Sequence, residues 1–108
     1  MQFMDIKNGR FYLGDCLEVM KEIPDGVVDM LLVDLPYGTT SCSWDSIIPL
    51  DELWKEYNRI CKENAAMVFT AAQPFTTALI ASNIKNFRYD WIWVKNGVRS
   101  EEHTSELQ

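Results

Sequence analysis

The sequence predicts an α/β domain in which a mostly parallel sheet is flanked by helices. Two apolar runs support this fold class: residues 27–34 are rich in β-branched and aliphatic side chains, and residues 65–71 form a second such run. Between them, residues 50–64 carry apolar side chains at the spacing of an amphipathic helix. Strands that alternate with helices are typical of sheets whose neighbouring strands run parallel.

Local signals place the elements of the first third of the chain. Residues 10–13 form a short candidate strand that ends at a Gly-Asp pair. Asp15 is a suitable N-cap for a helix from Cys16 to about Ile23, because its carboxylate can accept hydrogen bonds from the first free backbone N–H groups. The segment Pro24-Asp25-Gly26 then predicts a turn that leads into the strand 27–34.

The remaining elements follow in the same way. Residues 38–45 form a polar loop, which the helix 50–64 and the strand 65–71 follow. The segment Gln73-Pro74-Phe75 predicts a turn into a helix that reaches about residue 84. Residues 89–95, which are rich in aromatic and aliphatic side chains, predict a fourth strand.

The composition indicates one small globular domain. The chain has 108 residues, of which 47% are hydrophobic and 12% aromatic. It contains no run of about eighteen apolar residues and no amino-terminal signal core, so we expect a cytoplasmic protein with no membrane partner. Three widely separated cysteines and a single histidine predict neither a disulfide framework nor a metal site.

The charge of the chain limits its partners. The formal net charge is -6 at pH 7. Affinity for nucleic acid comes mainly from Lys and Arg side chains that neutralise phosphates. If the substrate is nucleic acid, we therefore expect a basic partner or a basic segment outside this chain.

Residues 99–108 differ abruptly from the rest. They contain three acids, the only histidine and a single large apolar residue. This decapeptide also resembles the translation of a common sequencing-library adapter, read in frame from its first base. We therefore expect residues 1–98 to form the domain and residues 99–108 to be a non-native tail; the alternative is a natural polar tail.

The tetrad Asp34-Leu35-Pro36-Tyr37 stands where the strand 27–34 ends. Open α/β sheets bind ligands at the carboxyl ends of their strands. Asp34 offers a carboxylate acceptor, and Pro36 biases Leu35 toward an extended backbone, which presents the Leu35 carbonyl as a second acceptor. Tyr37 adds a flat face on which a planar ring can stack. The tetrad therefore predicts a pocket for the amine-bearing edge of a nucleobase.

Two fixed acceptors also suit a reaction at that amine. The lone pair of an exocyclic amine is normally delocalised into its ring, so the nitrogen is a poor nucleophile. Drawing both N–H bonds toward acceptors favours a pyramidal nitrogen whose lone pair points at an electrophile, which is preorganised electrostatic catalysis. Such a reaction needs no covalent enzyme intermediate.

The tetrad resembles the D-P-P-Y motif of amino-methylating DNA methyltransferases. Other segments are similar to phage and bacterial members of the β group of that family, and with the tetrad they extend over essentially all of residues 5–97: Gly14-Asp15-Cys16-Leu17-Glu18, Gly38-Thr39-Thr40, Trp44-Asp45, Gln73-Pro74-Phe75 and Trp91-Ile92-Trp93. The resemblance implies a partial Rossmann-like methyltransferase fold, S-adenosylmethionine as methyl donor, and a target adenine flipped out of double-stranded DNA. The family includes restriction-modification, phage and orphan enzymes, and the sequence fits each.

The resemblance assigns expected roles to single residues. Asp34 and the Leu35 carbonyl would hold the amine, and Tyr37 would stack on the base. Asp15, Cys16 and Asp34 are candidates for contact with the cofactor, although an N-cap role explains Asp15 equally well. Two aromatic residues are candidates for the wall of the base pocket, the solitary loop residue Trp44 and the strand-end residue Phe75.

The sequence departs from the family at two points. The second tetrad position is usually Pro and is Leu35 here, which keeps the carbonyl acceptor but loses backbone rigidity. The five glycines are scattered, so no glycine-rich F-x-G-x-G loop brings backbone close to a cofactor. We therefore expect an amino-terminal part of a DNA adenine-N6 methyltransferase that is inactive by itself.

Three other interpretations stay open. A cytosine-N4 methyltransferase needs the same acid-led turn and stacked aromatic. A non-catalytic nucleic-acid-binding module could retain the fold without the reaction. A part of a larger sheet could also expose strand edges and associate with itself.

Overall fold

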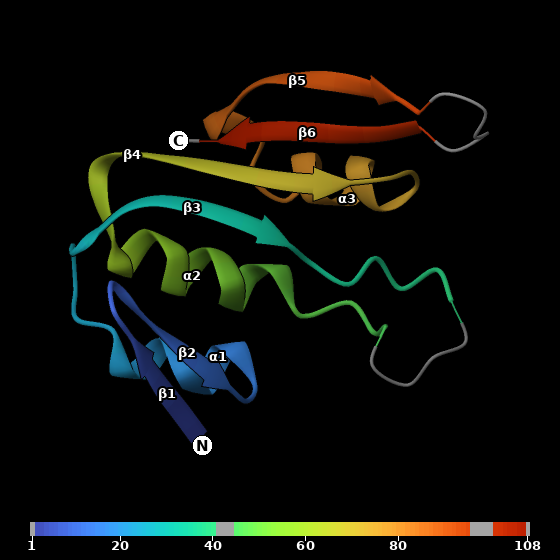
Figure 1. Cartoon of the computed structure of the whole chain (residues 1–108). Coiled ribbons are helices and arrows are strands. Elements are labelled where there is room, and N and C mark those ends of the chain that lie inside the picture. Colours follow the sequence, from blue (N-terminus) through green and yellow to red (C-terminus); the bar gives the residue numbers. More distant parts are fainter. Residues whose placement is uncertain (1, 41–44, 96–100, 108) are drawn as a thin grey trace.

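The computed structural model describes residues 2–40, 45–95 and 101–107 and contains two separate sheets (Figure 1). Strands β1 (Gln2–Ile6) and β2 (Gly9–Leu13) pair antiparallel as a hairpin. A four-stranded sheet has the order β3-β4-β6-β5. Its strands are β3 (Val28–Asp34), β4 (Cys61–Ala71), β5 (Phe87–Val94) and β6 (Glu101–Leu107). The predicted α/β class is confirmed.

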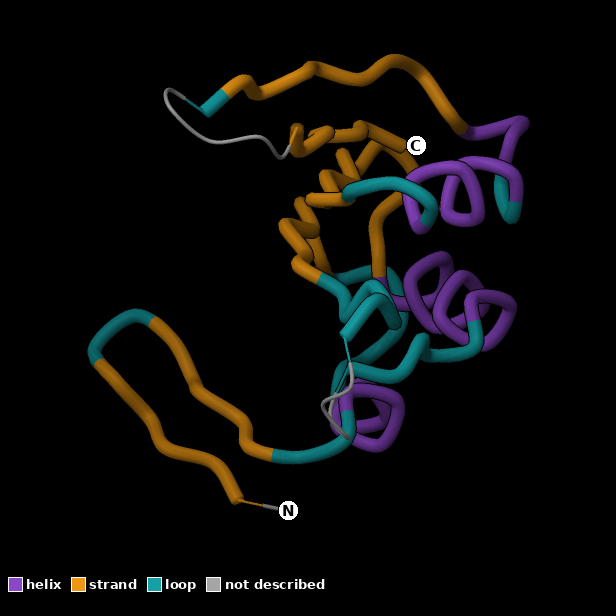
Figure 2. The backbone as a smooth tube through the Cα atoms, turned by 90° about the vertical axis from the view of Figure 1, so that its right-hand side faces the viewer, coloured by secondary structure: helices purple, strands orange, loops and turns teal. Residues whose placement is uncertain are grey.

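The hairpin is an element that the sequence prediction recognised only in part. Strand β2 matches the predicted strand 10–13, whereas β1 was not predicted. Ile6 pairs with Gly9 across the two-residue turn Lys7-Asn8, and two-residue turns are the commonest connections of a hairpin. The hairpin projects away from the rest of the chain, and several of its apolar side chains are exposed (Figure 2).

A short helical segment follows the hairpin where the sequence predicts a helix from Cys16 to about Ile23. It consists of α1 (Cys16–Val19) and the 3₁₀ helix η1 (Met20–Glu22). The Leu17 backbone N–H donates to Asp15 Oδ1 at 2.9 Å, so the predicted N-cap is confirmed. Met20 is buried, and it fixes this segment against the core.

Strands β3 and β4 form the parallel pair around which the core is built. They are joined through α2 (Leu50–Ile60), and both point toward the same side of the molecule (Figure 1). The helix buries side chains at the 3.6-residue period, as its sequence predicts. The rings of Trp54 and Tyr57 lie against the fully buried ring of Phe69 on β4, with centroid distances of 5.3 and 5.9 Å.

The prediction that this helix continues to residue 64 is wrong, because α2 ends at Ile60 and Cys61 begins β4. The Arg59 and Ile60 carbonyls accept hydrogen bonds from the N–H groups of Gly26 and Val27, each at 2.9 Å. A further helical turn is therefore not needed to satisfy these carbonyls. The Arg59 guanidinium also donates to the Met20 and Ile23 carbonyls, which fastens the end of α2 to the preceding turn.

Helix α3 (Phe75–Ala81) is shorter than predicted and is followed by the 3₁₀ helix η2 (Ile84–Asn86). Phe75 and Leu79 are almost completely buried. The Trp54 indole N–H donates to Ser82 Oγ at 2.8 Å, so the end of α3 is tied directly to α2.

The helices lie on one side of the four-stranded sheet (Figure 2). Buried side chains alternate along β4 from Ala65 to Ala71, as expected for a strand with one covered face. On β3, Met30 and Leu32 remain 55% and 72% exposed. Among the described side chains, the hydrophobic core therefore lies between one face of the sheet and helices α2 and α3.

The expectation of a mostly parallel sheet is confirmed only for β3 and β4. Strand β6 pairs antiparallel with β4 on one side and with β5 on the other. Residues 101–107 lie within the predicted tail and were excluded from the predicted fold. Backbone pairing depends little on side-chain identity, so an unpaired strand edge can accept this segment whatever its origin.

No helix in the described ranges is long and apolar enough to cross a membrane.

The one-sided core makes a stability prediction. Leu53 on α2 is 1% exposed, whereas Leu32 on β3 is 72% exposed. We expect Leu53→Ala to lower the free energy of unfolding by about 2 to 5 kcal/mol, because it removes buried contacts and leaves a cavity. The matched control Leu32→Ala should change it by less than about 0.5 kcal/mol. Urea unfolding followed by circular dichroism measures both, and equal losses would contradict a core on one face only.

Candidate functional site

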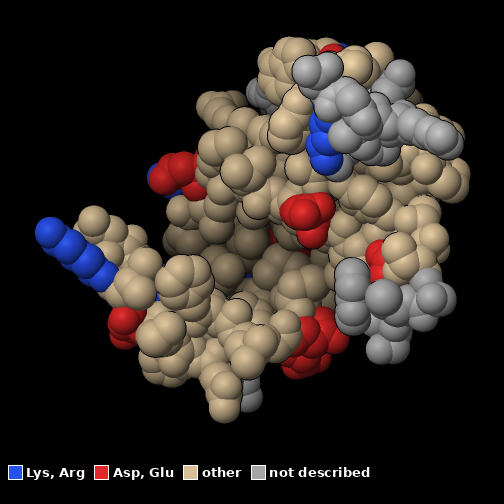
Figure 3. All heavy atoms as spheres, turned by 45° about the vertical axis from the view of Figure 1, so that its right-hand side comes forward, with Lys and Arg blue, Asp and Glu red and all other residues tan. Residues whose placement is uncertain are grey.

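A cavity of about 940 Å³ opens at the carboxyl end of β3. Three segments line it: the turn into α1 at residues 14–17, the tetrad at residues 34–37, and the loop residues 39–40 and 45–49. The face of the molecule drawn in Figure 3 is hollowed near its centre. The parallel pairing of β3 and β4 exposes their polar strand ends at this edge, where open α/β sheets bind ligands.

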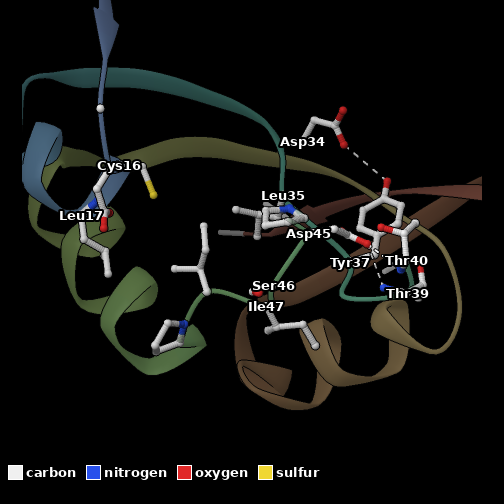
Figure 4. A pocket seen from close by; sticks show the side chains of 15 residues that line it. Cys16, Leu17, Asp34, Leu35, Tyr37, Thr39, Thr40, Asp45, Ser46 and Ile47 are labelled. Atoms are coloured by element: carbon white, nitrogen blue, oxygen red, sulfur yellow. Dashed lines mark hydrogen bonds between the residues drawn. The ribbon is translucent and has the colours of Figure 1, made fainter. Parts of the chain in front are cut away.

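Asp34 is the last residue of β3 and takes part in a hydrogen-bonded group with Tyr37 and Thr70. Thr70 on β4 pairs with Asp34 in the parallel register, and its hydroxyl donates to Asp34 Oδ1 at 2.6 Å. The Tyr37 hydroxyl donates to Thr70 Oγ1 at 3.1 Å. It also lies 3.5 Å from Asp34 Oδ1 (Figure 4). The sequence prediction did not include Thr70, because the strand pairing that brings it to Asp34 is a property of the fold.

Tyr37 is supported from behind by Phe75. The two rings are stacked, with centroids 5.3 Å apart and planes inclined by 20°. Phe75 is 2% exposed and is absent from the cavity lining. Its observed contact is thus with the ring of Tyr37, and direct contact of Phe75 with a substrate, as predicted from the sequence, has no support in this geometry.

The middle of the tetrad anchors the turn. Leu35 is 7% exposed and belongs to the hydrophobic core, although its atoms also reach the cavity wall. Pro36 lines the cavity beside it. Burial of the Leu35 side chain holds the turn against the core, while Asp34 and Tyr37 remain at the cavity.

The loop after the tetrad folds around Asp45. Its carboxylate accepts hydrogen bonds from the backbone N–H groups of Gly38, Thr39 and Thr40, at 3.1, 3.0 and 2.7 Å. Gly38 has a φ of 73°, and a Cβ there would lie 2.7 Å from the Ile47 side chain, so glycine is required. Sequence reasoning noted Asp45 in the polar loop and gave it no role.

Hydrogen bonding affects the ionisation of this aspartate. The Thr40 hydroxyl, followed by the Thr40 and Gly38 backbone amides, holds the pKa of Asp45 below its usual range. Each of these donors favours the charged carboxylate over the neutral acid. The ionised form of Asp45 is therefore the one that organises the loop.

Asp15 and Cys16 form the opposite wall of the cavity. Asp15 caps α1 and also lines the cavity, so the two roles considered for it are compatible. Burial raises the pKa of the half-buried Cys16 thiol, and the neighbouring charge of Asp15 adds to the effect. Cys16 therefore offers a neutral thiol to the cavity at pH 7, which is a weak nucleophile.

The structure thus brings six of the eight predicted site residues into one cavity lining. These are Asp15, Cys16, Asp34, Leu35, Pro36 and Tyr37. Phe75 lies behind Tyr37, and Trp44 lies outside the described residues. Within the described ranges, no group of three or more His, Cys, Asp or Glu side chains is placed to hold a metal ion.

The cavity combines features that suit a planar, amine-bearing ligand. Asp34 supplies a carboxylate acceptor next to the tyrosine ring, and the lining residues Leu35, Pro36 and Ile47 supply apolar surface. Acidic side chains lie close to the hollow in Figure 3, whereas Lys and Arg lie mainly at the margins of that face. This charge distribution favours a donor of hydrogen bonds and disfavours a phosphate held by the cavity itself.

The Asp45 interactions predict a loop that loosens in acid. Because the pKa of Asp45 is lower in the folded chain than in the unfolded chain, its contribution to stability is complete above the unfolded value of about 4. The contribution is lost as the pH falls through the lower, folded pKa. We expect Asp45→Ala to accelerate hydrogen exchange at the Gly38, Thr39 and Thr40 amides at pH 7 by about tenfold.

The exposed residue Glu63 provides the control for this experiment. Glu63→Gln also removes one carboxylate, but at a position on β4 distant in sequence from the loop. It should leave the three amides at their original exchange rates, measured by NMR. Unchanged exchange in Asp45→Ala would show that Asp45 does not organise the loop.

No protein-family model matches the sequence, and a search of the curated proteins found no match.

Proposed function

We propose that this chain is the amino-terminal part of a DNA adenine-N6 methyltransferase. In this proposal its cavity holds the exocyclic amine of an adenine that has been flipped out of double-stranded DNA. The observation that carries the proposal is the shared cavity of Asp34 and Tyr37 with Asp15 and Cys16. A base site and a donor site on facing walls are what a direct transfer between two bound molecules requires.

The role of Asp34 follows from its contacts. The Thr70 hydroxyl donates to Oδ1, and the Tyr37 hydroxyl lies 3.5 Å from the same oxygen. In the hydrogen bonds described for this site, Oδ2 is the carboxylate oxygen left to accept an amine N–H. The Leu35 carbonyl would accept the second N–H, so that the nitrogen lone pair is directed away from both acceptors.

The residues that line the cavity form part of the binding site that a methyl donor needs. The cavity volume of about 940 Å³ lies within the range of small-molecule sites, and its far wall offers the Asp15 carboxylate beside Cys16 and Leu17. When bound, S-adenosylmethionine would supply an electrophilic methyl group. Asp34 and the Leu35 carbonyl would keep the amine nitrogen oriented toward that methyl group, and the proton that the amine loses would leave to solvent. Asp34 would orient the nitrogen throughout.

The proposal also requires segments outside this chain. A formal net charge of -6 disfavours unassisted binding of this chain to a DNA backbone. The scattered glycines include no glycine-rich loop to cradle the donor. We propose that a basic DNA-binding region and this loop belong to segments of the complete protein outside this chain.

A direct test uses this complete protein, recovered from an independent DNA source. We expect Asp34→Asn to lower methyl transfer to DNA by about 100-fold or more while DNA binding is retained, because one amide oxygen replaces a charged acceptor. Transfer is measured by incorporation of labelled methyl groups, and the product by mass spectrometry of the nucleosides.

The matched control is Asp29→Asn, on the same strand but paired with Lys62 at 2.6 Å and outside the cavity lining. It should leave transfer unchanged. Unchanged transfer in Asp34→Asn would refute the assigned role. Methylcytosine without methyladenine would replace the proposal by its nearest rival, a cytosine-N4 methyltransferase.

For the 108-residue chain alone we expect no methyl transfer and at most weak binding of S-adenosylmethionine. The physical reason is the absence of closely spaced glycines, which allow backbone N–H groups to approach a cofactor. Isothermal titration calorimetry measures this affinity. A dissociation constant in the micromolar range would contradict the expectation and would show that the residues that line the cavity suffice.

A further inference from the structure

We infer that Thr70 is a positioning residue of the proposed amine clamp and that its hydroxyl gives the clamp its selectivity for an amine. The inference rests on the proposed function of the cavity. Thr70 lies near the end of β4, directly opposite Asp34 in the parallel register. It belongs to a different segment of the chain from the tetrad.

The hydrogen bonds around Thr70 have one consistent direction. A threonine hydroxyl has one hydrogen to donate and two lone pairs that accept. The hydrogen goes to Asp34 Oδ1 at 2.6 Å, and a lone pair accepts the Tyr37 hydroxyl at 3.1 Å. The direct distance from the Tyr37 hydroxyl to Asp34 Oδ1 is 3.5 Å, which is at the limit for a hydrogen bond. Thr70 is therefore the bridge that connects the aromatic ring to the carboxylate.

This bridge fixes the orientation of the Asp34 carboxylate. A short hydrogen bond to Oδ1 restricts rotation of the carboxylate about its terminal bond, which is otherwise broad. Oδ2 then keeps one direction, and a substrate N–H meets an acceptor that is already in place. Thr70 is also β-branched, so its own side chain has few alternative rotamers on a strand.

The same contacts place the Tyr37 ring. Phe75 stacks behind the ring, and the hydroxyl is held by Thr70, so both the ring plane and its polar tip are fixed. Loss of the Thr70 hydroxyl would leave Oδ1 and the Tyr37 hydroxyl 3.5 Å apart without a bridge. The expected defect is thus specific to ligands that present an amine to Asp34.

The test compares two nucleosides that differ only at the amine. Adenosine carries the exocyclic amine, and purine riboside has hydrogen in its place. Their dissociation constants are measured by NMR titration of the 108-residue chain and its variants. For the unchanged chain we expect adenosine to bind about ten- to a hundredfold more tightly, the value of one hydrogen bond to a charged acceptor.

The Thr70→Val variant keeps the shape of the side chain and removes the hydroxyl. We expect the preference for adenosine to fall to within about twofold, with the affinity for purine riboside unchanged. Thr70→Ser restores the hydroxyl and should retain the preference. The matched control is Thr77→Val on α3, which removes a hydroxyl that is bonded to Gln73 and lies outside the cavity lining. It should behave like the unchanged chain.

The possible results distinguish a wrong role for Thr70 from a wrong function for the cavity. If the unchanged chain binds both nucleosides equally, or binds neither, the proposed amine clamp fails. If that chain prefers adenosine and Thr70→Val keeps the preference, the role of Thr70 alone is refuted. Equal weakening of both nucleosides would assign Thr70 a merely structural role. If Thr70→Val does not fold, Thr70→Ser decides: a folded serine variant without the preference overturns the inference.

Discussion

The parallel pairing of β3 with β4 is the constraint on which the rest of the structure depends. Its register sets Val33 opposite Phe69 and Asp34 opposite Thr70. The pair Val33 and Phe69 therefore contributes to the core, while the pair Asp34 and Thr70 places polar side chains at the strand ends. A shift of one residue would exchange the two faces and place the carboxylate against the helices.

The covered face explains why this register is well determined. Phe69 is fully buried among side chains of α2, and Trp54 connects that helix to the end of α3. These contacts exist only if the odd-numbered residues from Ala65 to Ala71 face the helices. The hydrophobic core therefore specifies the geometry of the cavity, although few core side chains reach it.

Much of the fold could be predicted from the sequence because its signals are local. Apolar runs predict β3 and β4, the helical spacing of apolar residues predicts α2, and Asp15 as N-cap predicts the start of α1. The end of α2 could not be predicted in this way, since its carbonyls are satisfied by Gly26 and Val27 from a distant segment. The same holds for the candidate site: the tetrad stands out in the sequence, whereas Thr70 becomes visible only through strand pairing.

The hydrogen bonds of the Asp45 carboxylate lower the entropic cost of binding a ligand in the cavity. Three successive backbone N–H groups form a concave arrangement that commonly captures a bound anion. Here the chain supplies the anion itself, so residues 38–40 acquire their conformation during folding. Ordering a residue costs about 1 to 2 kcal/mol of conformational entropy, and a ligand that enters the cavity does not bear this cost for these three residues. The wall of the cavity next to Tyr37 is in this sense preorganised.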